Sequence, residues 1–366
     1  MKISYINFYR QWIEERNYLD KIFRNIFSKG VFVGGSSIDK FEKNLARYCK
    51  IKYCVSLNSG TDALLLGMKL LGVKKGDEVI TPPNSFFSST SSIVHLGARP
   101  VFADILPDQS INPYEIKKKI TKKTKAIMPV HLTGRVCNMT EIKKISEEYK
   151  IPIIEDAAQS IGSKYKKKFS GTFGEIGCFS AHPLKNLNAS GDAGFMVTNN
   201  KKFYLMAKSL SNHGSVTRDK YKHFGYLSRM DTLQAEILNF RLKKISQIIK
   251  KRRANANYYF ENIKNSLILL EKEKKDEFNT YHTFVVKIKK KRKQFIDYLF
   301  NKGIETRIHY PTPIHLQPAS KRLGYLKGDF PETERQSEQI LTLPINQFLK
   351  KEELEYICWN INNFNC

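Results

Sequence analysis

Lys185 lies in the segment CFSAHPLKNLNASGDAG (residues 178–194), five positions after Ser180 and among small and polar residues. A lysine amine can bond to an aldehyde, can be exchanged there for the amine of another molecule, and can then move protons as a general base. Its charge does not distinguish it, because the chain contains 62 lysines and arginines. Its interpretation therefore depends on the groups that other segments bring to it.

Two further segments place reactive groups where a strand is expected to end or a helix to begin. IPIIEDAAQS (151–160) is an apolar run that ends in Glu155 and Asp156. SLNSGTDALLL opens a helix at Gly60 and Thr61, whose free N–H groups can bind an anion. Taken alone, the first segment is better explained as an ordinary strand followed by a helix cap, and the second is equally well explained as an ordinary helix cap.

Together these groups match what pyridoxal 5'-phosphate requires. The phosphate of this cofactor needs N–H and O–H donors, its ring nitrogen needs a carboxylate, and its aldehyde needs an amine. Gly60, Thr61 and Ser180 offer the donors, Asp156 offers the carboxylate, and Lys185 offers the amine. On the residues alone, a pyridoxal phosphate site is one hypothesis among several.

The elements that must position these groups alternate along the first 200 residues. Helical patterns, such as the apolar spacing over residues 61–72, separate short apolar or β-branched runs. Those runs predict strands at 54–57, 78–81, 100–105, 125–130, 151–156 and 178–180. Strands that alternate with helices predict a mostly parallel sheet with helices on both faces. Such sheets bind ligands beyond the carboxyl ends of their strands, where Asp156 and Ser180 are expected.

The texture of the sequence changes after about residue 200. Helical patterns occupy 231–264, 291–302 and 351–361, and a strand is predicted at 281–288. We therefore predict an α/β protein with two domains. The large domain spans residues 1–230, N-terminal segment included, and a smaller α+β C-terminal domain spans residues 231–366.

Composition narrows the class of protein. The 366 residues are 41% apolar, which is enough for two cores. No stretch approaches the ~20 apolar residues that span a bilayer, and the first residues lack a signal-peptide pattern, so a cytoplasmic protein without membrane attachment is expected. The six cysteines form no CxxC pair and no cluster with the eight histidines, which predicts reduced, mostly buried thiols and neither a metal site nor a disulfide framework.

The formal net charge of +27 is compatible with three kinds of partner. Nucleic acid, an anionic membrane surface and an anionic small substrate would all be attracted. Most of the charge lies in short runs, such as 117–125 and 287–293, which are interrupted by apolar residues as on solvated faces. A compositional bias of the genome would produce the same surplus. Since no nucleic-acid-binding motif is present, a non-enzymatic nucleic-acid-binding protein is the less favoured class.

Nine segments, in their order along the chain, resemble the DegT/StrS-type (DnrJ/EryC-like) sugar aminotransferases, a branch of the fold type I pyridoxal-phosphate enzymes. The resemblance extends from about residue 8 to the C-terminal helix. The segments are SLNSGTDALLLG, EVITPPNSFFSST, GARPVFADI, MPVHLTG, IIEDAAQSIGSKY, CFSAHPLKNLNASGDAG, GYLSRMDTLQAEIL, IETRIHYPTPIHLQPA and LTLPIN. The resemblance implies a mixed, mostly parallel seven-stranded sheet between helices and a homodimer with active sites at its interface.

The resemblance also assigns roles to residues that match the family's motifs. Lys185 matches the lysine that bonds to the cofactor, and Asp156 matches the acid that pairs with its ring nitrogen. Gln159 matches the glutamine beside the ring hydroxyl, and Phe86 the aromatic residue that stacks over the ring. The phosphate site is matched by Gly60, Thr61 and Ser180. Phe87, next to Phe86, is expected to be a core residue.

Three positions call for comparison with the family pattern. Some relatives carry histidine in place of the lysine and act as dehydratases, but His182 lies three residues before Lys185, so we expect it to be structural or a wall of the site. Leu227 replaces an asparagine that reaches the cofactor phosphate across the dimer interface, and leucine cannot donate that hydrogen bond. Either another group, such as Arg229, replaces it, or the cofactor is bound more weakly. Ala193 replaces a glycine, a small change unless the position requires positive φ.

The activity that the resemblance implies is transfer of an amino group from L-glutamate to a keto sugar. The expected acceptor is a nucleotide-linked 3- or 4-keto-deoxysugar, in amino-sugar and surface-polysaccharide biosynthesis. His309 and Tyr310 are candidates for contacts with the sugar, with loop packing as their alternative role. A dehydratase that uses pyridoxal or pyridoxamine phosphate, and an aminotransferase for a non-nucleotide keto sugar or a cyclitol, stay open as alternatives.

Overall fold

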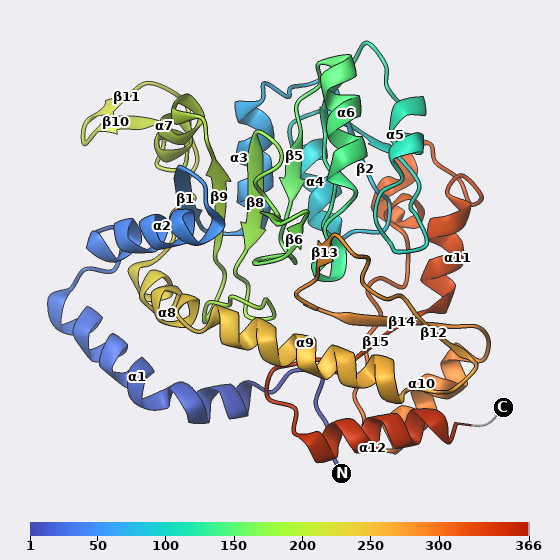
Figure 1. Cartoon of the computed structure of the whole chain (residues 1–366). Coiled ribbons are helices and arrows are strands. Elements are labelled where there is room, and N and C mark those ends of the chain that lie inside the picture. Colours follow the sequence, from blue (N-terminus) through green and yellow to red (C-terminus); the bar gives the residue numbers. More distant parts are fainter. Residues whose placement is uncertain (365–366) are drawn as a thin grey trace.

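The computed structural model describes residues 1–364 and centres on a sheet between layers of helices (Figure 1). Two groups of strands, β1-β9-β8-β5 and β4-β2-β3, are joined by parallel bridges from Ile127 to Ile153 and from Val130 to Asp156. Within the described part of this sheet, only β9 runs antiparallel to its neighbours. Its strands are β1 (Tyr53–Leu57), β2 (Glu78–Thr81), β3 (Arg99–Phe102), β4 (Thr124–Ile127), β5 (Ile154–Asp156), β8 (Ile176–Ser180) and β9 (Gly194–Thr198). The predicted mostly parallel sheet is confirmed.

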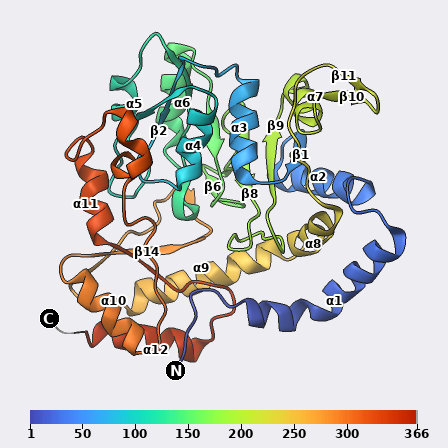
Figure 2. The same ribbon diagram turned by 180° about the vertical axis from the view of Figure 1, so that it is seen from behind.

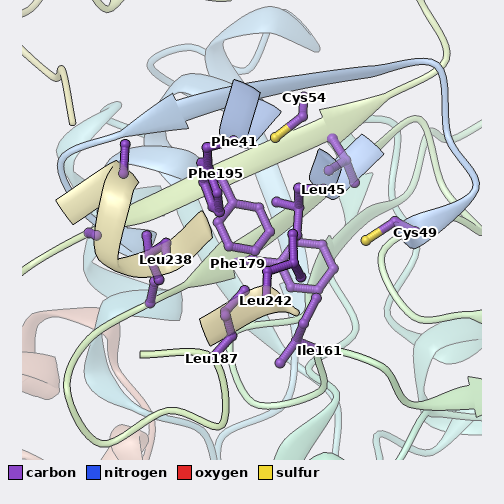
Figure 3. Packing of buried hydrophobic residues seen from close by; sticks show 14 of the residues in the cluster. Phe41, Leu45, Cys49, Cys54, Ile161, Phe179, Leu187, Phe195, Leu238 and Leu242 are labelled. Carbon is purple, nitrogen blue, oxygen red and sulfur yellow. The ribbon is translucent and has the colours of Figure 1, made fainter. Parts of the chain in front are cut away.

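Alternating side chains of β8 and β9 explain why helices cover both faces of the sheet. Phe179 and Phe195 stack on one face with ring centroids 4.8 Å apart, and Phe41 of α2 packs against them (Figure 3). Their chain neighbours Cys178 and Met196 belong to the core on the opposite face, under α3. The surrounding helices are α2 (Ser36–Cys49), α3 (Gly60–Leu70), α4 (Phe87–His95), α5 (Pro113–Lys118), α6 (Met139–Tyr149), α7 (Lys201–Leu210) and α8 (Thr232–Leu242).

A second, antiparallel sheet in the order β12-β14-β15 forms the smaller part of the molecule. Its core contains Tyr259, which is fully buried and donates its hydroxyl to the carbonyl of Pro344 at 2.6 Å. Ile3, from the other end of the chain, belongs to the same core and bridges to Ile304. The elements are α9 (Ile245–Asn262), β12 (Ile268–Leu270), β14 (Phe284–Ile288), α10 (Arg292–Asn301), α11 (Pro331–Gln339), β15 (Ile340–Leu343) and α12 (Lys351–Asn362).

The boundary at residues 230 and 231 stays a prediction. Helix α8 packs on α2 and belongs to the core of the large sheet, together with Ile245 and Ile249 from the first turns of α9. The end of α9 belongs to the core of the smaller sheet. Helix α9 therefore connects the two cores, as it does across the lower part of Figure 1.

The remaining elements are one long helix and several short segments. Helix α1 (Phe8–Lys29) begins where the Asn7 side chain accepts a hydrogen bond from the N–H of Arg10, and it runs along the outside of the molecule in both views (Figures 1 and 2). The short elements are η1 (Leu132–Gly134), β6 (Lys164–Tyr165), β7 (Lys168–Phe169), β10 (Ser215–Thr217), β11 (Lys220–Tyr221), β13 (Glu277–Phe278), η2 (Ile314–Leu316) and η3 (Pro318–Leu323).

Two predictions from composition concern helices and thiols. Among the helices of residues 1–364, none has the length and apolarity needed to cross a membrane. The five cysteines in this range are buried free thiols, as predicted, and Cys366 lies outside the described residues.

Candidate active site

The carboxyl ends of β5 and β8 open into a cavity of about 420 Å³. Asp156 ends β5, Ser180 ends β8, and the turn after β8 carries Lys185 to the same place. Every residue predicted for the site lines this cavity: Gly60, Thr61, Phe86, Asp156, Gln159, Ser180, Lys185, His309 and Tyr310. The strand-end location expected of a parallel sheet is therefore where these groups meet.

Asp156 is a buried carboxyl whose two oxygens are held by neighbours. Oδ2 accepts a hydrogen bond from the Ser89 hydroxyl at 2.7 Å, and Oδ1 accepts one from the N–H of Ala158 at 3.1 Å. Burial raises the pKa of Asp156, while those two bonds and the charge of Lys185 oppose the rise. The carboxyl is thus fixed in direction and faces the cavity that Lys185 also lines.

Lys185 is a half-buried amine on a closed turn. The backbone N–H of Lys185 donates to the carbonyl of His182 at 2.8 Å. The backbone N–H of Ala189 donates to the carbonyl of Ala181 at 2.7 Å, and this bond closes the turn around Lys185. Burial lowers the pKa of the amine to about 8, although the charge of Asp156 acts in the opposite direction. A lysine with this pKa is neutral in a useful fraction of molecules near neutral pH, and a neutral amine is a nucleophile and a base.

The first turn of α3 provides the anion site. Its N–H groups at Gly60 and Thr61 are free of intrahelical partners by geometry, and the Thr61 hydroxyl donates to Ser88 Oγ at 3.0 Å. A Cβ on Gly60 would lie 2.8 Å from the Cβ of Ser180, and one on Gly194 would lie 2.2 Å from the carbonyl carbon of Ser59. Glycine at these two positions therefore lets the start of α3 pack directly against Ser180 and β9, which brings the backbone N–H groups of α3 and the Ser180 hydroxyl to the same side of the cavity, an arrangement that fits a phosphate group.

Gln159, Tyr310, His309 and Phe86 form the wall above these groups. Gln159 accepts a hydrogen bond from the N–H of Thr133 at 2.8 Å and donates one to the Tyr310 hydroxyl at 3.2 Å. The Phe86 ring is 57% exposed and lies 5.9 Å from the Tyr310 ring. Burial, followed by the charge of Lys185, lowers the pKa of His309 to about 4, so this imidazole is neutral near pH 7.

Of the other residues singled out in the sequence, two line the cavity and the rest lie outside it. His182 lines the cavity, in agreement with its predicted role as a wall. Ala193 also lines it and is not among the residues of positive φ in the described chain, so alanine is accommodated there. Leu227 is 62% exposed and, like Arg229, does not line the cavity formed by residues 1–364 of its own chain. Phe87 is 38% exposed, so its predicted place in the core is wrong: it opens α4 and faces outward.

Sequence reasoning missed several polar groups that line the cavity, among them Tyr5, Ser89, Arg252, His282 and Asn346. Ser89 could have been suspected from the serine-rich run NSFFSSTSS, which follows β2. The other four come from the N-terminal segment and the smaller part of the molecule. They reach the site through tertiary packing, for which the sequence carries no local signal.

Several known proteins with a similar sequence or fold are aminotransferases. The model of the DegT/DnrJ/EryC1/StrS aminotransferase family matches residues 14–362. A relative from Aneurinibacillus thermoaerophilus, dTDP-3-amino-3,6-dideoxy-alpha-D-galactopyranose transaminase, is 37% identical over 349 residues, covering 94% of this chain and 95% of its own.

Two solved structures extend the comparison. DesV of S. venezuelae superposes with a TM-score of 0.96 at 30% identity and covers 99% of this chain and 98% of its own. The PLP form of Spr1654 from Streptococcus pneumoniae, described as a putative sugar aminotransferase, has a TM-score of 0.90 at 26% identity and covers 94% and 95% of the two chains.

Proposed function

Because this chain belongs to the DegT/DnrJ/EryC1/StrS aminotransferase family, we propose that it transfers an amino group from L-glutamate to a nucleotide-linked 3- or 4-keto-deoxysugar. Its general class is that of a pyridoxal-phosphate-dependent sugar aminotransferase of fold type I, a class that acts in amino-sugar biosynthesis. One observation carries the assignment to this site: Lys185, Asp156 and the first turn of α3 line a single cavity.

The residues that would hold pyridoxal phosphate follow from the donors on each wall. Gly60, Thr61 and Ser180 would bind the phosphate, because the close packing of Gly60 on Ser180 brings the N–H groups of the first turn of α3 and the Ser180 hydroxyl to one wall of the cavity. Asp156 would bind the ring nitrogen, a role supported by the hydrogen bonds from Ser89 and Ala158 that fix the orientation of its carboxyl group. When bound, the cofactor supplies an aldehyde that accepts the amino group and a ring that withdraws electrons from the reacting carbon.

Lys185 is the group that moves the proton. Burial lowers the pKa of Lys185, so Nζ is neutral in a fraction of the molecules at working pH. A neutral Nζ can take a proton from the donor carbon and return it to another carbon of the same complex. The closed turn between Ala181 and Ala189 restricts where Nζ can travel. Burial raises the pKa of Asp156, so this carboxyl stays ionised only if its hydrogen-bond partners offset that rise. Ser89 is one of these partners and therefore helps to keep Asp156 charged.

His309, Tyr310 and Phe86 are proposed to orient the sugar. His309 donates to or accepts from the Thr342 hydroxyl at 3.0 Å, which fixes the ring beside the cavity. Tyr310 is held by Gln159. The nucleotide link is supported by the name of the Aneurinibacillus thermoaerophilus relative, whose substrate is a dTDP sugar. The basic surplus of the chain would favour such an anionic acceptor.

A homodimer completes the proposal. Five aromatic side chains of α1 and the segment after it are between 47% and 53% exposed: Phe8, Trp12, Phe23, Phe27 and Phe32. The rings of Phe23 and Phe27 stack 4.1 Å apart, and Phe32 lies 5.2 Å from Phe27. Phe23, Phe27 and Phe32 thus form an exposed cluster of touching aromatic rings, and exposed apolar clusters of this kind mark interfaces. Leu227, on the exposed surface of one copy, is proposed to face the cavity of the other.

The activity test uses the purified holoenzyme with ¹⁵N-labelled glutamate and a panel of keto sugars. The panel contains 3-keto and 4-keto deoxysugars linked to dTDP, UDP or GDP, a free keto sugar and a keto cyclitol. The proposal expects the ¹⁵N label in an amino-sugar nucleotide. An equal amount of 2-oxoglutarate, which carries no nitrogen, should form from the glutamate. Label only in the free sugar or cyclitol, or water loss without label, would instead establish one of the alternative activities.

A further inference from the structure

Arg252 is a buried cation without an acidic partner at the edge of the active-site cavity. It comes from α9, lines the cavity, and is 5% exposed. No carboxylate of residues 1–364 makes an ion pair with it, and Tyr5 is the titratable neighbour that most affects it. A charge in this position is costly unless another group pairs with it, so the structure leaves a place for an anion.

The hydrogen bonds of Arg252 show which part of the guanidinium is available. Nη1 donates to the carbonyls of Tyr281 and His282 at 3.1 and 3.2 Å, and Nε donates to Gln347 at 3.2 Å. Nη2 has no partner among the described residues. The protein therefore fixes the guanidinium plane from one side and leaves Nη2 for a ligand.

The imidazole of His282, a neighbour of Arg252 in the cavity, is neutral and does not compete with an anion. Burial holds the pKa of His282 well below its usual range, with further lowering by nearby Lys185 and Arg252, so this imidazole is uncharged near pH 7. Its Nδ1 is buried and has no hydrogen-bond partner within residues 1–364. Burial lowers the pKa of Arg252 to about 10, and the side chain is still protonated at neutral pH.

We propose that Arg252 binds a carboxylate of the amino donor through Nη2, while the amine of the donor reacts beside Lys185. The inference rests on the proposed function and adds a residue that selects an anionic amino acid as donor. A small carboxylate suits this position, because Arg252 is almost wholly buried, whereas the exposed Phe86 and His182 line the part of the cavity open to a larger sugar nucleotide.

Arg253 provides a matched control on the same helix. Its guanidinium pairs with Glu273 at 2.8 Å and donates to the carbonyl of Asn279, and it does not line the active-site cavity. Replacing either arginine by glutamine removes one charge from α9. Arg252→Lys keeps the charge but loses the fixed fork of the guanidinium, so it separates loss of charge from loss of geometry.

The experiment measures binding of two unreactive probes to the holoenzyme by calorimetry, with melting temperature and cofactor content recorded for each variant. Glutarate represents the donor, and UDP-glucuronate represents an acceptor that itself carries a carboxylate. We expect Arg252→Gln to weaken glutarate about ten- to a hundredfold, as for loss of a charged hydrogen bond. The affinity of Arg252→Lys for glutarate should lie between those of the wild type and Arg252→Gln. The affinity of Arg253→Gln should stay within about threefold of the wild type, a small change in binding free energy.

The two ligands distinguish the possible sources of the carboxylate. Weaker glutarate binding with unchanged UDP-glucuronate binding supports the proposal. An unchanged glutarate affinity, an equal loss for both probes, or no glutarate binding by the wild type overturns it. Failure of the proposed function is seen separately, as a wild type that binds glutarate but transfers no ¹⁵N from glutamate.

Discussion

Glu155 precedes Asp156 at the end of β5, and its replacement by glutamine tests how the fold holds the site. Its Oε2 accepts hydrogen bonds from His131 Nε2 and the N–H of Gly171, both at 2.8 Å. Its Oε1 accepts from the N–H groups of Phe173 and Gly174 at 2.6 and 2.7 Å. The carboxylate is fully buried, so water does not reach this position to replace it as the acceptor for the four donors.

The cost of Glu155→Gln follows from this arrangement. A glutamine has one acceptor oxygen, so whichever way the amide is turned, two of the four donors face an NH₂ group. Each buried donor left without an acceptor costs about 1–3 kcal/mol, and breaking a buried charged pair costs about 3–5 kcal/mol. We therefore expect the free energy of unfolding to fall by about 3–5 kcal/mol.

Urea unfolding of the apoprotein, followed by far-UV circular dichroism at one fixed protomer concentration, measures this change. Glu175→Gln is the control, because the Glu175 carboxylate is exposed and accepts one described hydrogen bond, from the N–H of Ile153 at 2.6 Å, which an amide oxygen can also accept. The control should stay within about 0.5 kcal/mol of the wild type. If Glu155→Gln is equally harmless, the four-donor explanation of this strand end is wrong.

Two further predictions concern the acid at the site and the exposed aromatic surface. Ser89→Ala removes a donor that lowers the pKa of Asp156, so the acid limb of the pH–rate profile should move to higher pH; an unmoved or lowered limb would show that Ser89 does not help to set this pKa. Phe27→Glu places a charge in the aromatic patch of α1, so sedimentation should show single chains at concentrations where the wild type is dimeric, and a wild-type mass would remove this patch from the interface.

The strands of the large sheet were largely predictable because each is a short apolar run between turn signals. The segment EVIT was predicted as a strand at 78–81 and forms β2 over the same residues. The helix predicted at 61–72 is α3, and the long pattern at 231–264 contains α8 and α9. Strand β9 is not among the predicted strands, and its direction was not predictable either, since GFMVT is buried on both faces and its side-chain pattern is the same in either direction.

The groups on the large-domain side of the cavity were also predictable, because strand ends and a helix start bring Asp156, Ser180 and Gly60 to one edge of the sheet. Arg252 was not, since the segment KKRRANANYY has the composition of a solvated basic helix face. The structure separates its two arginines: one is buried beside the cavity and the next pairs with Glu273. Only the packing of α9 against both cores makes that difference.

Visible absorbance of the purified protein tests the central claim most directly, because it reports the bond between Lys185 and the cofactor without requiring the substrate to be known. The wild type should be yellow and should transfer label from glutamate. Lys185→Ala, which removes the one amine that the structure places beside Asp156, should lose both the visible absorbance and turnover while it keeps its far-UV circular dichroism spectrum. A folded Lys185→Ala variant that retains the absorbance and the turnover of the wild type would contradict the account.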